Sequence, residues 1–400
     1  MTDRLPLDGV RVVELASWVM APAAAGILAS YGADVVKIEP AGGGDPSRGG
    51  TVVVDGQPIE AGFELANNRK RSVHLDLGTD AGREVIQRLL EHADVFVTNV
   101  RTGALTRAGL LPADLIEAYP RLIVAHATGY GTRGPHVERP AFDELAYWSR
   151  GGIAAAITPE SQPPVGLAGA MGDLPSAVAM VAGVTMALLQ RERDGHGGIV
   201  DVSLYQCGLW TNGWVLQQAL VGAEVRQRRD RTASFSPLYN SYRCRDGKWV
   251  QFAMLQPDRY WRPLCMALER PDLGEDERFR DATSLREHAG EAIVELDRLI
   301  GAIDSDDLER RLDGQDLPWS PIFNTAEIAA DEQARVNGYI VPKAHRSGVP
   351  IETVSPPFHL RGATLQFGPA PEAGQDTEVV LAEAGYSWDE ISSLRERGAY

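Results

Sequence analysis

Val10-Arg-Val-Val-Glu-Leu15, followed along the chain by Asp34-Val-Val-Lys-Ile-Glu39, decides the fold of this protein. Both runs are short and apolar, as buried strands are, and the alanine-rich segment Pro22–Tyr31 between them predicts a helix. A strand, a helix and a second strand form a unit in which the two strands lie parallel. The chain therefore begins with a Rossmann-like pattern.

The same alternation continues beyond this first unit. Further strands are predicted at 72–77, 95–98, 122–126 and 199–204, with a helix over 79–92 and a long helix that starts at Asp173 and is broken by Gly195-His-Gly-Gly198. Strands that alternate with helices favour an α/β fold with a mainly parallel sheet covered on both faces.

A chain of 400 residues exceeds one ordinary core, so we expect two domains. The charged run Arg226-Gln-Arg-Arg-Asp-Arg231 indicates an exposed connection between them. We predict a large Rossmann-like domain over 1–225. A smaller α+β domain is expected over 226–335, and a C-terminal segment, 336–400, that packs back on the large domain.

Composition excludes some partners. A net charge of -16 argues against nucleic acid, which needs a basic surface. Three scattered cysteines (Cys207, Cys244 and Cys265) form no disulfide framework, which favours a reducing cytoplasm. Met1–Asp8 has no apolar leader, and the apolar stretch 177–189 is shorter than a membrane span. We therefore expect a cytoplasmic protein with no membrane partner.

Two glycine-rich segments suggest phosphate binding, but neither has the required context. Gly129-Tyr-Gly-Thr-Arg-Gly134 matches the dinucleotide motif, yet Pro135 and Pro140 follow it where a helix should open. Gly42-Gly-Gly-Asp-Pro-Ser-Arg-Gly49 lacks the lysine and hydroxyl residue that end a phosphate loop. Basic residues do gather in 67–71 and 99–107. They are either phosphate ligands at one edge of the sheet or a solvated surface cluster.

The stretch Val165-Gly-Leu-Ala-Gly-Ala-Met-Gly-Asp173-Leu-Pro-Ser-Ala-Val carries the candidate chemistry. Asp173 lies between small residues and an apolar helix. It is either a helix N-cap with Pro175 in the first turn, or an ionised carboxylate that attacks an activated acyl group. The histidines do not cluster at ligand spacing, so we predict no metal site.

Taken together, these segments resemble the class III CoA-transferase family, the formyl-CoA:oxalate and carnitine type. The matching segments run in family order. They are 6–14, 31–40, 44–49, 69–77, 98–103, 172–173, 197–204, 237–250 and 374–381.

The resemblance implies a two-domain fold, an interlocked homodimer, and acyl-CoA and a carboxylic acid as substrates, with no tightly bound cofactor. It implies that Asp173 is the catalytic residue and forms an aspartyl-CoA thioester. We expect backbone N–H groups near Gly172 and in the second domain to stabilise each oxyanion. The remaining implied contacts fall into three sets: Lys70, Asn99 and Arg107 at CoA; Ser17, Trp18 and Val19 on the loop lining the CoA pocket; and Phe142, Asp143 and Leu204 in the acyl pocket.

Departures from the family bear on the substrate. Some members have arginine where Pro40 stands, so we do not expect that phosphate contact here. Some also have glutamine where Val19 stands. The glycine run that covers the oxalate-type site has no counterpart in 232–242. Oxalate and formate are therefore disfavoured, and Trp18, Val19 and Phe142 favour a medium or bulky acid.

Two alternatives remain open. Racemases of 2-methylacyl-CoA in the same family pair a histidine with an aspartate, but that histidine would lie where Phe142 stands, and phenylalanine transfers no proton. Asp143 and Asp173 would have to form the acid/base pair instead. The second alternative is a CoA-binding module without chemistry, which the presence of Asp173 disfavours.

Overall fold

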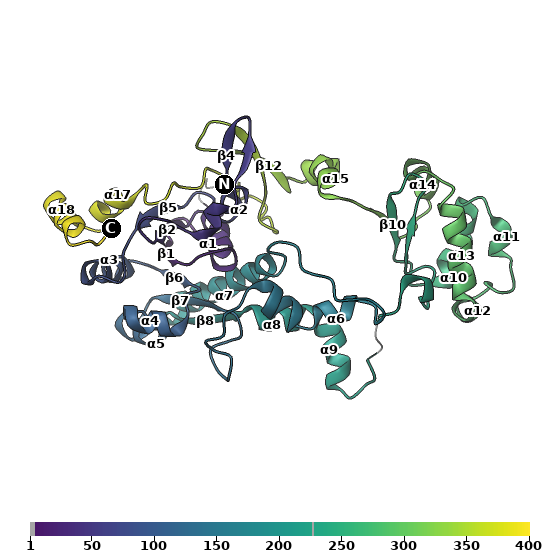
Figure 1. Cartoon of the computed structure of the whole chain (residues 1–400), viewed down its shortest axis with the longest axis horizontal. Helices are drawn as coiled ribbons and strands as arrows, with labels where there is room; N and C mark the ends of the chain where they lie inside the picture. Colours follow the sequence, from purple (N-terminus) through teal and green to yellow (C-terminus); the bar gives the residue numbers. More distant parts are fainter. Residues whose placement is uncertain (1–4, 226–227) are drawn as a thin grey trace. The chain divides into compact units, whose positions relative to one another are not determined.

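The computed structural model describes residues 5–225 and 228–400. Met1–Arg4, at the start of the predicted leader-free segment, and Arg226–Gln227, in the predicted connection, lie outside the described residues. The chain forms two compact units. The large unit comprises the residues up to Ala156, Val165–Glu224 and Arg335–Tyr400, and the small unit comprises Ile157–Pro164 and Val225–Ala334. Figure 1 colours both along the chain.

A six-stranded sheet forms the centre of the large unit. Its strands are β1 (Arg11–Leu15), β2 (Asp34–Glu39), β5 (Arg71–His74), β6 (Val95–Thr98), β7 (Ile123–Thr128) and β8 (Gly198–Ser203). The order is β5-β2-β1-β6-β7-β8, and every neighbouring pair is parallel. This confirms the predicted α/β fold. The order changes direction between β1 and β6, as in doubly wound nucleotide-binding folds.

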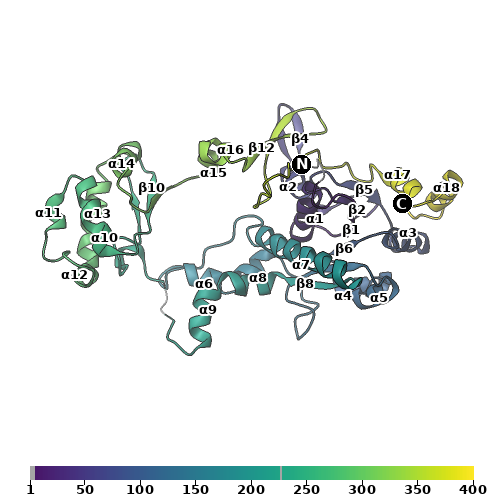
Figure 2. The ribbon, with the colours of Figure 1, turned by 180° about the vertical axis from the view of Figure 1, so that it is seen from behind.

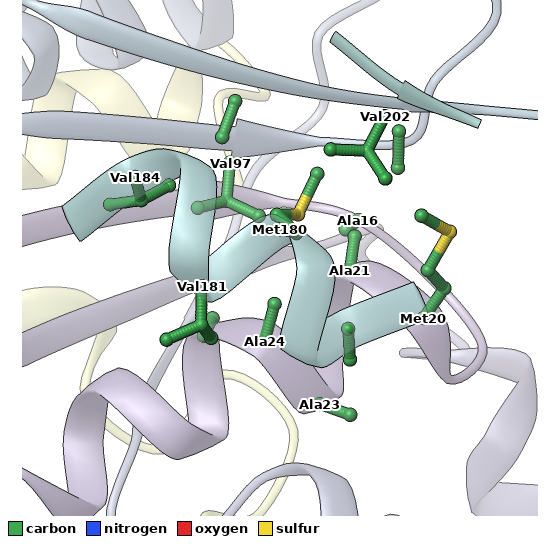
Figure 3. Packing of buried hydrophobic residues seen from close by; sticks show 14 of the residues in the cluster. Ala16, Met20, Ala21, Ala23, Ala24, Val97, Met180, Val181, Val184 and Val202 are labelled. Atoms are coloured by element: carbon green, nitrogen blue, oxygen red, sulfur yellow. The ribbon is translucent and has the colours of Figure 1, made fainter. Parts of the chain in front are cut away.

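Two helices cover one face of this sheet, α1 (Met20–Ser30) and α7 (Asp173–Asp194). Figure 3 shows Met180 and Val184 of α7 packed with α1 alanines and with Val97 of β6. The small alanine side chains let α1 lie close to its neighbours. A Cβ added to Gly26 of α1 would lie 2.4 Å from the carbonyl oxygen of Ala66, so only glycine fits there.

The opposite face is covered by helices from both ends of the chain. They are α3 (Asp80–Leu90), α4 (Thr102–Ala108), α5 (Pro112–Ala118), α17 (Thr377–Glu383) and α18 (Trp388–Glu396). Alternate strand residues point here: Val12 faces α1 and α7, whereas Val13 lies in the core with Val85 and Leu381. The C-terminal segment is hydrogen-bonded to the sheet, since Ser72 N–H donates to Asp376. Figures 1 and 2, seen from opposite sides, both show α17 near β5 and α3.

Helix α7 is long and apolar enough to cross a membrane by length and composition alone, so the prediction that its apolar part is too short is wrong. The helix extends to Asp194, beyond the stretch 177–189. Its residues Ala177, Met180 and Val184 are fully buried against the sheet and α1. These residues lie on one face, and only 28% of the apolar 18-residue window is buried. The helix ends before Gly195, whose φ of 80° is the left-handed conformation that glycine adopts freely.

The small unit has its own core. An antiparallel sheet in the order β11-β10-β9 packs on α-helices through Tyr242, Phe252 and Leu296. Its elements are β9 (Ser241–Arg243), β10 (Trp249–Phe252), β11 (Trp319–Ile322), α10 (Pro257–Ala267), α11 (Pro271–Gly274), α12 (Ala282–Glu287), α13 (Ala289–Ile300), α14 (Ser305–Leu312) and α15 (Thr325–Ala330).

The remaining elements connect these layers. They are a 3-10 turn at Pro46–Gly49, the hairpin of β3 (Val52–Val54) and β4 (Gln57–Ile59), α2 (Ala61–Ala66), a π-helix at Glu144–Ser149, α6 (Ile153–Ile157), α8 (Leu204–Thr211), α9 (Gly213–Leu220), a 3-10 turn at Arg231–Ala233, α16 (Glu332–Val336), β12 (Ile340–Ala344) and β13 (Pro350–Val354).

Candidate active site

The carboxyl edge of the sheet gathers most of the predicted site residues. Ser17–Val19 follow β1, Asn99 follows β6, Asp143 lies beyond β7, and Leu204 follows β8. Helix α7 leads into β8, which is parallel to β7, so its first residue, Asp173, lies at the same edge. Ligands of open α/β sheets bind outside this edge, near the point where the strand order changes direction.

The loop after β1 is held in a fixed conformation. Asn99 clamps Ser17 from both sides: Ser17 N–H donates to Asn99 Oδ1 at 3.1 Å, and Asn99 Nδ2 donates to the Ser17 carbonyl at 2.6 Å. Trp18 has a φ of 70°, which is unfavourable for a residue with a Cβ. Its N–H donates to Asp45 Oδ1 at 3.1 Å. Asn99 therefore shapes the loop through its amide.

An aromatic pair stands beside this loop. The Trp18 ring meets the Phe142 ring edge-on, with centroids 5.5 Å apart and an interplanar angle of 87°. The two side chains remain 46% and 53% exposed, respectively. Large exposed apolar side chains that form a contiguous surface mark a binding region. The two rings form an exposed apolar surface at this edge of the sheet.

Asp173 is the first residue of α7, and Gly172 before it is tightly packed. A Cβ at Gly172 would lie 2.7 Å from Tyr147 and 2.8 Å from the Asp143 Cβ. Gly172 N–H donates to Asp143 Oδ2 at 2.9 Å, and Glu144 N–H donates to Asp143 Oδ1 at 2.9 Å. The Gly-Asp pair is thus fixed against the segment that begins with Asp143.

The Asp173 carboxylate is half-buried and accepts no hydrogen bond from any residue in 5–225 or 228–400. Burial, together with the charge of Asp143, raises the pKa of Asp173 to about 7. With this pKa, Asp173 is about half ionised at neutral pH, which is less than its position at the start of a helix predicts, because nearby amides are already occupied. Gly172 N–H bonds Asp143 and Leu174 N–H bonds the Ala170 carbonyl.

The same contacts bear on two further predictions, that Asp173 is the N-cap of α7 and that the Gly172 N–H group stabilises an oxyanion. Asp173 is not the N-cap, since Gly172 holds that position and α7 has no side-chain cap. The Gly172 N–H already has an acceptor, so this amide is not free to stabilise an oxyanion.

Lys70 is the predicted CoA ligand that the structure places elsewhere. Its side chain is 0% exposed, and its three N–H groups meet three oxygens. These are Glu14 Oε2 at 2.6 Å, the Pro22 carbonyl at 2.7 Å and Asn67 Oδ1 at 2.8 Å. Burial, assisted by the charge of Lys37, lowers the pKa of Lys70 to about 8. We therefore correct the expectation: Lys70 has no donor left for a phosphate in this arrangement.

Leu204 and Arg107, two further predicted site residues, differ from each other in exposure. Leu204 is buried in the apolar core with Ala16 and Tyr147, so its side chain does not line an open surface. Val19 packs partly against the same core. Arg107, near the end of α4, is exposed and makes no ion pair with the described residues. Its guanidinium is available to an anionic ligand.

Sequence reasoning missed the buried charges beneath the loop. Lys37 Nζ lies 2.7 Å from Glu14 Oε1 and 2.8 Å from Asp45 Oδ2. The signal was present in the strands themselves, since Glu14 and Lys37 interrupt apolar runs that are buried on both faces. A charge in such a run indicates an internal ion pair.

Comparison with known proteins identifies the family. The family model described as CoA-transferase family III matches residues 7–377. The (R)-2-hydroxy-4-methylpentanoate CoA-transferase of Clostridioides difficile is 33% identical, covering 98% of this chain and 98% of its own. The cinnamoyl-CoA:phenyllactate CoA-transferase of Clostridium sporogenes is 31% identical, covering 97% and 96%. A formyl-CoA:oxalate CoA-transferase of Escherichia coli O157:H7 is 28% identical, covering 98% and 99%.

Solved structures give the same result. A CAIB/BAIF family protein from Brucella suis superimposes with a TM-score of 0.85 and is 28% identical, covering 95% of this chain and 100% of the other. A hypothetical protein from Mycobacterium tuberculosis gives a TM-score of 0.80 at 27% identity, covering 94% and 99%. The chain belongs to CoA-transferase family III, and it is an enzyme that acts as a CoA-transferase on CoA thioesters.

Proposed function

We propose that this enzyme moves CoA from an acyl-CoA to a carboxylic acid through a covalent aspartyl-CoA thioester on Asp173. The observation that carries the proposal is the Asp173 carboxylate itself. It begins a helix at the ligand-binding edge of the sheet, accepts no hydrogen bond from the described residues, and has a pKa raised to about 7. A carboxylate without hydrogen-bond donors keeps its lone pairs available for attack on an acyl carbon.

The steps balance without any further reactant. The Asp173 carboxylate attacks the thioester carbonyl of the donor, and the carbon–sulfur bond breaks to give a mixed anhydride and CoA thiolate. The thiolate attacks the aspartyl carbonyl, releasing the donor acid and forming the aspartyl-CoA thioester. The acceptor carboxylate then attacks that thioester, and its carbon–sulfur bond breaks to give a second mixed anhydride and CoA thiolate. The thiolate attacks the acceptor acyl carbon, and the bond from that carbon to the Asp173 oxygen breaks. Asp173 is regenerated, and the thioester energy is conserved.

Asp143 favours the covalent intermediates over the resting enzyme. The repulsion between Asp143 and Asp173 exists only while Asp173 is ionised. Acylation of Asp173 removes one of the two negative charges, so the covalent intermediates are relieved of the repulsion that the resting enzyme carries. A carboxylate with a raised pKa is also the better nucleophile once it is ionised.

CoA would lie along the carboxyl edge. Its phosphates would meet Arg107, whose guanidinium has no ion-pair partner among the described residues. The loop Ser17–Val19, clamped by Asn99, would line the thioester end. Lys70 is excluded from this set because its ammonium group is fully enclosed.

The acid we propose has an apolar side chain of medium or large size. Trp18 and Phe142 form an exposed aromatic wall beside the Asp143–Gly172 contact. The relatives at 33% and 31% identity are named for 4-methylpentanoate and phenyllactate derivatives, which carry branched and aromatic groups. Both lines favour such acids over oxalate.

We further propose that two copies of this chain form the working enzyme, interlocked as the resemblance implies. Helices α8 and α9 support a dimer, because Trp210 and Trp214 are 87% and 83% exposed in the single chain. Exposed aromatic side chains of this size mark an interface. The cytoplasmic location and the lack of membrane or nucleic-acid partners remain predictions.

The test is to trap the intermediate. The full-length protein is incubated with isovaleryl-CoA and then with hydroxylamine, which converts an aspartyl thioester or anhydride to a hydroxamate. We expect peptide mass spectrometry to find the modification at residue 173 and nowhere in the Asp173→Ala variant. Transfer of solvent deuterium to the α-carbon with CoA left in place would overturn the proposal in favour of a racemase.

A further inference from the structure

A buried network of four charges lies directly beneath the loop after β1. Lys37 joins Glu14 to Asp45, and Lys70 holds the second oxygen of Glu14. The exposed fraction of each of these side chains is 1% or less. Although burial disfavours the charge, Glu14 and Asp45 raise the pKa of Lys37, which therefore stays charged.

Buried ion pairs contribute little net stability, because losing water costs about as much as the pairing returns. Such a network is therefore better explained by what it holds in place. Lys37 Nζ also donates to the Ala16 carbonyl at 2.9 Å, and Lys70 Nζ donates to the Pro22 carbonyl at 2.7 Å. These two carbonyls flank the loop 17–19, so the network fixes both ends of it.

The centre of the loop is held by Asp45. Its Oδ2 pairs with Lys37, while its Oδ1 accepts the N–H of Trp18 at 3.1 Å and the N–H of Ser47 at 2.9 Å. Trp18 has a φ of 70°, in the left-handed region that favours glycine. A residue with a Cβ stays there only when its surroundings hold it.

We propose that Asp45 is a positioning residue for acyl-CoA: by holding the Trp18 backbone in this conformation, it sets the indole against Phe142 and so shapes the wall that receives the acyl group. This inference rests on the proposed function, since it assigns the wall to the acyl end of the substrate. Asp45 itself touches no substrate and acts through Trp18.

Asparagine at this position is the informative substitution. Asp45 uses both carboxylate oxygens as acceptors, one toward Lys37 and one toward backbone N–H groups. An amide has a single oxygen, so Asp45→Asn cannot satisfy both sides while its volume stays the same. The chain also offers a matched control. Asp94 accepts the Arg11 N–H at 2.8 Å and pairs with buried Arg191 at 2.9 Å, at the amino edge of the same sheet.

The measurement is the equilibrium Kd for isovaleryl-CoA, by calorimetry on the full-length dimer, for the parent protein, Asp45→Asn and Asp94→Asn. We expect Asp45→Asn to raise this Kd about fivefold or more, the effect of losing one buried hydrogen bond. Asp94→Asn should lower the melting temperature to a similar degree and leave the Kd unchanged. An equal rise in both variants, or in neither, overturns the inference.

A second variant separates an action of Asp45 through Trp18 from a general loss of structure. Trp18→Gly accepts the left-handed conformation without strain and removes the indole. If Asp45 acts through Trp18, Asp45→Asn in the Trp18→Gly background causes no further rise in the Kd. A full additional rise contradicts the inference. Failure of the parent protein to bind isovaleryl-CoA at all would instead overturn the proposed function, and the inference with it.

Discussion

Asp143 and Asp173 begin two helical segments that meet at one edge of the large unit, yet their carboxylates have opposite surroundings. Asp143 accepts two backbone N–H groups, from Glu144 and Gly172. Asp173 accepts none from the described residues, and burial together with the charge of Asp143 raises its pKa to about 7. The charge of a carboxylate therefore depends more on the hydrogen-bond donors that reach it than on its position at the start of a helix.

Removing Asp173, the carboxylate that accepts no hydrogen bond from the described residues, should have the largest effect on activity. Asp173→Ala deletes the nucleophile, so we expect kcat for CoA transfer to fall by about four orders of magnitude or more. The measurement is the exchange of CoA between isovaleryl-CoA and a branched hydroxy acid. Asp173→Asn should match it, unless the amide hydrolyses slowly back to aspartate, which mass spectrometry would reveal. Near-parental activity of the alanine variant contradicts the mechanism.

The close contact between the two segments can be broken at Gly172. A methyl group there would lie 2.7 Å from Tyr147 and 2.8 Å from the Asp143 Cβ, so Gly172→Ala must push the segments apart. We expect kcat to fall about a hundredfold, because small displacements of a reacting group are costly. Gly169→Ala is the control, since a Cβ there meets nothing within 4 Å. Equal activities of the two variants would show that the contact is irrelevant to catalysis.

The pH dependence of kcat/KM tests whether the charge of Asp143 raises the pKa of Asp173. Because only ionised Asp173 attacks, kcat/KM should rise with pH and level off above a midpoint near 7. Asp143→Asn removes the repelling charge but keeps an oxygen for the Gly172 N–H, so the midpoint should move to lower pH. The ratio of variant to parent kcat/KM should then be up to about tenfold higher in acid than in alkali. An unmoved midpoint would assign the raised pKa to burial alone.

The smallest expected effect is on stability. Asp173 holds its proton more tightly in the folded chain, with a pKa of about 7, than its ordinary value of 3.8 allows in the unfolded chain. The folded state therefore binds more protons between these values, and stability falls as pH rises through them. Asp173→Asn lacks this loss. Its melting temperature should exceed that of the parent by roughly two to five degrees at pH 8, and by progressively less toward pH 4.

The fold could be predicted because short segments of the sequence are enough to indicate its strands and helices. Apolar strand runs such as Val95–Thr98, separated by segments with helical spacing, indicate a parallel sheet wherever they occur. The hairpin of β3 and β4 was missed, although Asp55-Gly56 is a recognised hairpin turn, because its strands are only three residues long.

The site could be predicted only in part. The sequence places Asp173 at a helix start, but Asp143 reaches the preceding glycine through the fold alone, so the raised pKa leaves no trace in spacing. The surroundings of Lys70 also differ from those that the sequence predicts. A lysine among basic residues was expected at the surface, whereas its ammonium group pairs with Glu14 inside the strand layer. Which charges are buried depends on the alignment of β1, β2 and β5, which no single segment encodes.

The return of the C-terminal helices to the sheet has a consequence for biosynthesis. All six parallel strands have been translated once Ser203 is made, but Val380, Leu381 and Ile391 complete the apolar layer over Val73 and Phe96 much later. At ribosomal speeds of about 5–20 residues per second, the nascent chain exposes this apolar surface for roughly ten to forty seconds. We therefore expect chaperones that recognise apolar segments to engage this chain while it is still attached to the ribosome.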